Sequence, residues 1–239
     1  MPNERRRPGR YLILLASLLL LLAVRPLVAG QYLKGSWIEA GAGLLVLLFV
    51  ALMRRRVFVI AAGLFVVGLA SSLLLLVTWN ETAPSGRLLL TVCTVTATVA
   101  FLCFICGVIL HEVVVSVPVT WNTVCGALCV YLLAGAVCAY LYLMIYLMDP
   151  GSFAGAYAAA APIDSPAALD QHSVVFTYYS FATLATLGMG DITPRSSLAR
   201  TLSWIEAVLG QIYLAVLVAR LIGLQKPPGE GRTDLGVRL

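Results

Sequence analysis

The 239-residue chain is 61% hydrophobic and only 11% charged, and its mean hydropathy is +0.96. Soluble domains carry about 25% charged residues, so this composition excludes an ordinary soluble enzyme and predicts an all-α integral membrane protein. The net charge of +5 fits either nucleic-acid binding or basic cytoplasmic loops. The positions of the basic residues distinguish these two cases.

Long apolar runs predict six membrane-spanning helices, because a bilayer core takes about 20 apolar residues per helix. The runs cover residues 11–29, 37–53, 57–78, 88–110, 121–148 and 198–223. Six such helices would leave only short loops between them, and no room for a separate soluble domain of typical size.

Basic residues cluster at the N-terminus, between the second and third runs, and in the C-terminal tail. The three clusters are Arg5, Arg6, Arg7 and Arg10; Arg54, Arg55 and Arg56; and Lys226, Arg232 and Arg238. An even number of spans puts all three on the cytoplasmic side, as the positive-inside rule requires. We therefore expect a multi-pass plasma-membrane protein surrounded by lipid, with cytoplasmic termini and no nucleic-acid partner.

The first run has a second interpretation as a signal peptide. Arginines at 5–7 precede an apolar stretch that ends in small residues at 28–30, which is the signal-peptide pattern. The stretch is long for that purpose, and Arg25 with Pro26 suits the outer interface of a retained helix. We expect the helix to be retained, with cleavage as the alternative.

All six cysteines lie in predicted helices, and Cys103 and Cys106 form a C-x-x-C spacing. A structural metal site needs about four ligands, and neither His111 nor His172 lies in the same segment. We therefore interpret the cysteines as small helix-packing residues rather than as metal ligands or disulfides.

The fourth run lacks the regularly spaced arginines of a voltage sensor. One elementary charge moved through 100 mV contributes only about 2.3 kcal/mol, so steep voltage dependence needs several charges. Arg87, at the edge of the run, is the only arginine or lysine there. Beyond the run, His111 and Glu112 form either a pH-sensitive pair or, as we favour, interfacial residues of a solvated loop.

The segment between the fifth and last runs does not fit a plain helix bundle. It opens with a turn signal at 149–151. A short apolar and aromatic stretch follows at 173–185, about half as long as a span needs to be. We expect this stretch to form a helix that enters the membrane and does not cross it.

Directly after that stretch stands the sequence T-L-G-M-G-D, residues 186–191. Glycines at alternate positions, Gly188 and Gly190, permit backbone conformations that other residues resist. Successive carbonyls can then face the same way and replace the water around a dehydrated cation. The hydroxyl of Thr186 could add an oxygen at the inner end, and the preceding short helix would aim its negative C-terminal end at the space below.

This hexapeptide resembles the T-V-G-Y-G-D selectivity filter of tetrameric potassium channels. The likeness continues through Ile192, Thr193 and Pro194, and residues 204–220 are similar to the inner helix of bacterial two-transmembrane-type channel domains. The resemblance covers residues 121–224, and the first four runs show no motif of that family.

The resemblance implies a homotetramer that conducts K⁺ passively, without enzymatic activity or a cofactor. It assigns the filter and its K⁺-binding carbonyls to Thr186, Leu187, Gly188, Met189 and Gly190, and the outer cap to Asp191. It implies that Tyr178, Tyr179 and Thr183 of the short pore helix support the filter. It assigns the inner-helix hinge and cavity to Gly210, Gln211, Leu214 and Val218. The implied division is a four-helix region (1–115), a pore domain (116–224) and a short disordered cytoplasmic tail (225–239).

The sequence departs from the family at two filter positions. Met189 stands where tyrosine is usual and Leu187 where valine is usual, so the aromatic packing behind the filter is lost while the carbonyls remain. A weakly selective monovalent cation channel therefore stays an alternative. Another is a non-conducting or transporter-associated membrane protein, although transporters usually show paired broken helices and this chain has one broken region.

Polar residues of the last run have two interpretations each. Glu206 is a functional candidate because ionisable side chains are costly inside a membrane, and we favour a hydrogen bond to the pore helix or filter over direct ion contact. Gln211 either faces the cavity or makes a helix–helix hydrogen bond. Arg200 and Arg220 are expected to reach the two membrane interfaces.

Overall fold

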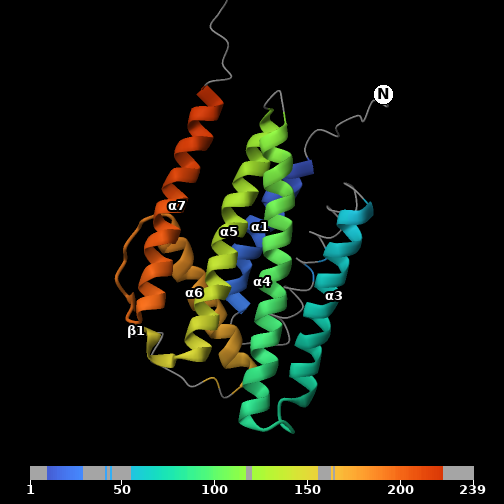
Figure 1. The fold of residues 1–239 in the computed structure, drawn as a ribbon, viewed down its shortest axis with the longest axis vertical. Helices are drawn as coiled ribbons and strands as arrows, with labels where there is room; N and C mark the ends of the chain where they lie inside the picture. The colour runs from blue at the N-terminus through green and yellow to red at the C-terminus, as the bar shows by residue number, and fades with distance from the viewer. Residues whose placement is uncertain are drawn as a thin grey trace, which may run out of the picture.

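The computed structural model describes residues 10–28, 41, 44, 55–116, 120–155, 163 and 165–222. These residues form an elongated bundle of helices (Figure 1). The helices are α1 (Arg10–Val28), α3 (Arg55–Thr78), α4 (Pro84–Val115), α5 (Trp121–Met148), α6 (Pro166–Leu184) and α7 (Ser197–Ile222), with a single 3-10 turn at Pro150–Ser152 and two short strands, β1 (Phe153–Gly155) and β2 (Ile192–Pro194).

Five helices, α1, α3, α4, α5 and α7, are long and apolar enough to cross a membrane. The predicted helical class is therefore confirmed for the described residues, and the chain is a multi-pass membrane protein. The predicted run at 37–53 lies outside the described residues apart from Gly41 and Leu44. The predicted disordered tail at 225–239 also lies outside them.

The fifth predicted run, 121–148, has the same ends as α5. Its start is set by a capping box in which the side chain of Thr120 accepts from Thr123 N and the side chain of Thr123 accepts from the backbone of Thr120. Helix α4 is longer than the predicted run 88–110 at both ends, because its polar end residues continue the helix beyond the apolar stretch.

Helix α6 begins earlier than the predicted start at residue 173. The hydroxyl of Ser165 accepts from Ala168 N at 3.1 Å, and a proline occupies the first turn of the helix, so the start has a normal N-cap. The expected helix began with the apolar stretch, yet the preceding residue His172 is 4% exposed and packs inside the protein. The expectation of a half-length helix is therefore wrong.

Strands β1 and β2 pair antiparallel, with Phe153 opposite Pro194 and Gly155 opposite Ile192. The chain between them rises along α6 and returns through residues 185–191 to the level at which α5 ended (Figure 1). Gly155 has φ +134°, and a Cβ there would lie 2.0 Å from the Asp191 carbonyl oxygen. Only glycine permits this close approach.

The interior has two groups of buried side chains. One joins α1, α3, α4 and α5 around residues such as Phe101 and Ile105. The other is largely aromatic and joins α5, β1 and α6 around Tyr142 and Phe176. Many large apolar side chains on the outside of the bundle stay exposed, as expected for a surface that faces lipid.

Candidate functional site: the segment between helices α6 and α7

Helix α6 ends in a Schellman motif. The N–H of Leu187 donates to the Ala182 carbonyl at 2.8 Å, and the N–H of Thr186 donates to the Thr183 carbonyl at 2.9 Å. Thr186 therefore occupies the position after the helix cap that is usually glycine, and its φ is +54°. A β-branched residue in this left-handed region carries a strain of about 1–3 kcal/mol.

The end of α6 lies beside the middles of α5 and α7. The hydroxyl oxygen of Ser180 lies 2.7 Å from the carbonyl oxygen of Gly135, which is halfway along α5, so the one Ser180 proton is shared between this carbonyl and Glu206. The carbonyl of Leu184 accepts from Tyr131 at 3.2 Å and lies against Gly210, halfway along α7. The backbone that follows α6 therefore begins near the middle of the two spans.

The backbone from 186 to 190 has positive φ at alternate residues. The values are +54° at Thr186, +62° at Gly188 and +78° at Gly190. Elsewhere in the described ranges only Gly155 has a positive φ. A change in the sign of φ at every second residue is the property expected from the alternating glycines, and it excludes a regular β-strand.

Residues 185–191 are all exposed in the single chain. The side chains of Leu187 and Met189 are exposed by 59% and 62%. The outer-cap candidate Asp191 accepts a hydrogen bond from the N–H of Ile192 at 3.0 Å. The segment is thus fixed at both ends, by α6 and by β2, and open along its length.

Glu206 is a buried carboxylate at the back of this segment, with an exposure of 2%. One carboxylate oxygen accepts from the hydroxyl of Tyr142 and the other from the hydroxyl of Ser180, both at 2.5 Å. These bonds join α7 to α5 and α6. The hydrogen bond to Ser180 is of the kind expected if Glu206 supports α6.

Aromatic side chains pack behind α6. The ring of Tyr179 lies 4.9 Å from that of Tyr142 and 5.6 Å from that of Phe153, both edge to face. The Tyr179 hydroxyl hydrogen-bonds Ser203 of α7 at 2.7 Å, whereas Tyr178 is 43% exposed. Tyr179 therefore joins α6 to α5, β1 and α7.

The remaining inner-helix candidates lie in different surroundings. Gly210 is buried against the end of α6, where an added Cβ would lie 2.7 Å from the Leu184 carbonyl oxygen. Gln211 is exposed, and its amide donates to the Thr186 hydroxyl at 3.2 Å. Leu214 is half-buried, and Val218 is 53% exposed.

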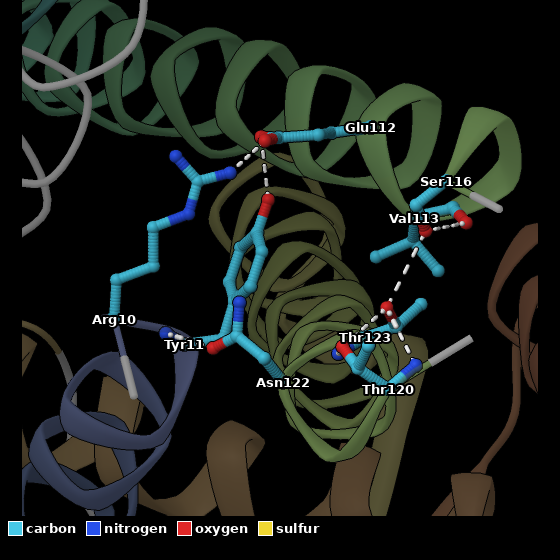
Figure 2. Close-up of polar contacts among 8 residues, drawn as sticks. All are labelled: Arg10, Tyr11, Glu112, Val113, Ser116, Thr120, Asn122 and Thr123. Carbon is cyan, nitrogen blue, oxygen red and sulfur yellow. Dashed lines mark hydrogen bonds and ion pairs between the residues drawn. The ribbon is translucent and has the colours of Figure 1, made fainter. Parts of the chain in front are cut away.

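A polar cluster joins α1, α4 and α5 (Figure 2), at the end of the bundle away from β1 (Figure 1). Glu112 of α4 forms an ion pair with Arg10 and accepts from the hydroxyl of Tyr11 at 2.5 Å. The N–H of Tyr11 donates to the side chain of Asn122 in α5 at 3.0 Å. The expectation of a solvated loop at Glu112 is therefore wrong, because the helix continues and brings the carboxylate to α1.

Arg220 belongs to the same end of the molecule. Its guanidinium donates to the carbonyls of Val114 and Ser116, both at 3.0 Å. These carbonyls lie at the C-terminal end of α4, where the helix dipole favours a cation. Arg220 therefore links the end of α7 to α4. At the other end of α7, Arg200 donates to the Pro194 carbonyl at 3.2 Å.

Sequence reasoning missed the residues that support the site from behind. Tyr142, Ser180 and Gly135 were not among the candidates, yet they hold α6 against α5 and α7. The available signal was Glu206, since a buried carboxylate needs hydrogen-bond donors. The sequence does not say which hydroxyls of which helices supply them.

Groups that could hold a metal ion through three or more His, Cys, Asp or Glu side chains were not found within the described ranges. The six cysteines are free thiols. The side-chain oxygens of the exposed segment after α6 are those of the Thr186 hydroxyl and the Asp191 carboxylate.

Comparison with known proteins supports a class for this region. Residues 126–224 match the ion channel family model. The match covers less than half of the chain, runs from α5 to the end of α7, and supports an ion-channel domain that includes α6 and residues 185–191. Neither a curated protein nor a solved structure matches the chain.

Proposed function

We propose that the chain is one subunit of a homotetrameric channel that conducts K⁺ passively. The observation that carries this proposal is the exposed backbone at 186–190, which has positive φ at alternate residues. This backbone begins beside the middles of α5 and α7. In the proposed pore, the carbonyls of these residues replace the water around K⁺. The ion channel match over residues 126–224 supports the same class.

Assembly follows from the polarity of this segment. Irregular backbone at membrane depth cannot face lipid, because its N–H and C=O groups would lack hydrogen-bond partners. In the single chain residues 185–191 are exposed, and so are Leu209 and Ile212 of α7. Copies arranged around one axis would enclose the segment and cover neighbouring apolar side chains. One filter strand per chain then gives a quarter of the pore.

The proposed roles follow the resemblance in the sequence. Residues 186–190 form the filter and Asp191 its outer cap, while Tyr179 and Glu206 support α6 through their bonds to neighbouring helices. We assign the pore domain to 116–224 and a separate four-helix region to 1–115. In this assignment Gly210 has a packing role rather than that of a hinge, since it contacts the Leu184 carbonyl.

The same proposal gives an orientation and a gating class. The starts of α1 and α3 and the end of α7 lie at one end of the bundle (Figure 1), and in the sequence the three basic clusters adjoin these helix ends. We place this end in the cytoplasm of a cell whose plasma membrane contains the protein. Helix α4 holds a single arginine, Arg87, so we expect no steep voltage dependence.

A weakly selective monovalent cation channel is the second candidate function. The exposure of Leu187 and Met189, 59% and 62%, favours it, because the described residues leave more than half of each side chain uncovered. A flexible methionine would restrain the filter less than the tyrosine usual in the family. The two candidates share one architecture and differ in selectivity.

Current measurements on purified protein in planar bilayers test both candidates. Under a gradient of K⁺ against Na⁺, we expect a reversal potential close to the K⁺ equilibrium potential. A reversal near zero would favour the weakly selective pore, and the absence of current would refute the channel. Gly188→Ala is a suitable control, because φ +62° disfavours alanine and the assembled variant should not conduct.

A further inference from the structure

The inner helix touches the start of the proposed filter at one polar contact. The side-chain amide of Gln211 donates to the hydroxyl of Thr186 at 3.2 Å. Gln211 directly follows Gly210, which has no side chain between α7 and the Leu184 carbonyl. The close approach at Gly210 therefore brings the amide within reach of the hydroxyl.

Threonine is an unusual residue at position 186. The position ends a Schellman motif and has φ +54°, a conformation in which glycine carries no steric penalty. Strained residues of this kind cluster at functional sites, where the strain serves another interaction. The group that threonine provides and glycine lacks is the hydroxyl that Gln211 contacts.

The hydrogen bond restricts what this hydroxyl can do. A hydroxyl has one donor and two acceptor lone pairs, and the Gln211 N–H occupies one of the lone pairs. The other lone pair stays available to a cation, in an orientation that the hydrogen bond fixes. The positive end of the N–H dipole also lies against the oxygen and weakens its field toward a cation.

A weaker oxygen field favours the larger of two cations. Na⁺ holds its hydration water more strongly than K⁺, so replacing that water demands a stronger ligand field from the filter. We propose that Gln211 is a positioning residue that fixes the Thr186 hydroxyl and biases the inner end of the filter toward K⁺. This inference rests on the proposed function, since it requires a conducting filter.

The test compares Gln211→Leu with wild type and with Gln171→Leu. Gln171 is an exposed glutamine of α6 and gives the same exchange away from the contact. We expect Gln211→Leu to lower the ratio of K⁺ to Na⁺ permeability about five-fold, which corresponds to about 1 kcal/mol, and Gln171→Leu to leave it unchanged. Gln211→Met, which is unbranched, replaces the leucine variant if that one does not assemble.

A second readout separates positioning from a structural role. We expect K⁺ to raise the unfolding temperature of the wild-type oligomer above its value in Na⁺, and this difference to shrink in Gln211→Leu. In a Thr186→Ala background, which lacks the hydroxyl, the Gln211 exchange should change the difference no further. Equal effects in both backgrounds would overturn the inference.

The two proposals fail in different ways. A wild-type protein that carries no current refutes the channel itself. A wild-type protein that conducts K⁺ selectively, with an unchanged permeability ratio in the Gln211 variant, refutes only the role of Gln211.

Discussion

Substitution of Gly210 by alanine distinguishes two roles for this glycine. As a hinge, Gly210 would provide flexibility, and alanine would stabilise the helix by up to about 1 kcal/mol. In the structure an added Cβ lies 2.7 Å from the Leu184 carbonyl oxygen and 2.9 Å from the Leu184 Cδ1. Ordinary contact begins at 3.4 Å, so α7 and the end of α6 would have to separate by about 0.7 Å.

The separation has a predicted cost. Adding a methylene-sized group to a packed site destabilises a protein by about 1–3 kcal/mol, which lowers the unfolding temperature by about 2–12 °C for a chain of this length. The displaced α6 end carries Thr186, so we also expect a lower conductance.

Thermal unfolding of the purified oligomer in detergent, followed by size-exclusion chromatography, measures the effect. Gly63→Ala is the matched control, since Gly63 lies within α3 and an added Cβ there meets no atom within 4 Å. We expect Gly63→Ala to be neutral or slightly stabilising. An unfolding temperature for Gly210→Ala as high as that of the control would refute the packing role and favour the hinge.

Three further substitutions test the surroundings of the candidate filter. Glu206→Ala leaves the buried hydroxyl of Tyr142 without the acceptor it has in the structure, at about 1–3 kcal/mol, whereas the Ser180 hydroxyl keeps the Gly135 carbonyl as an acceptor. Thermal unfolding should show a larger loss than for Glu206→Gln, which keeps an acceptor, and equal losses would contradict this. Gly155→Ala places a Cβ 2.0 Å from the Asp191 carbonyl oxygen, so β1 and β2 should separate. Proteolysis near this pair should then be faster than in wild type, and an unchanged digestion pattern would argue against the pairing. Met189→Tyr should keep conduction and increase the K⁺ to Na⁺ permeability ratio in reversal-potential measurements, and a silent but assembled variant would mean that Met189 packs differently from the family tyrosine.

The sequence determined the helices and their approximate ends. Apolar runs of membrane length have a direct physical cause, since every backbone group in lipid must be hydrogen-bonded within its own helix. The run at 121–148 was therefore placed without error. The start of α6 was misplaced, because apolar character was the criterion for a helix and the polar first turns of α6 do not show it.

The alternating glycines also determined the backbone of the candidate filter in advance. Positive φ at Gly188 and Gly190 is a local property of residues that lack a Cβ. Thr186 was different, because no local preference places threonine in the left-handed region. Its conformation depends on the hydrogen bonds that end α6.

Contacts between helices were decided only by the tertiary structure. The sequence marked Glu206 and Gln211 as polar residues in an apolar span, and left two interpretations for each. Their partners, Ser180 and Thr186, come from distant parts of the chain. Helix formation is local and periodic, whereas the pairing of polar groups depends on which faces of the helices meet, and packing of the whole bundle determines those faces.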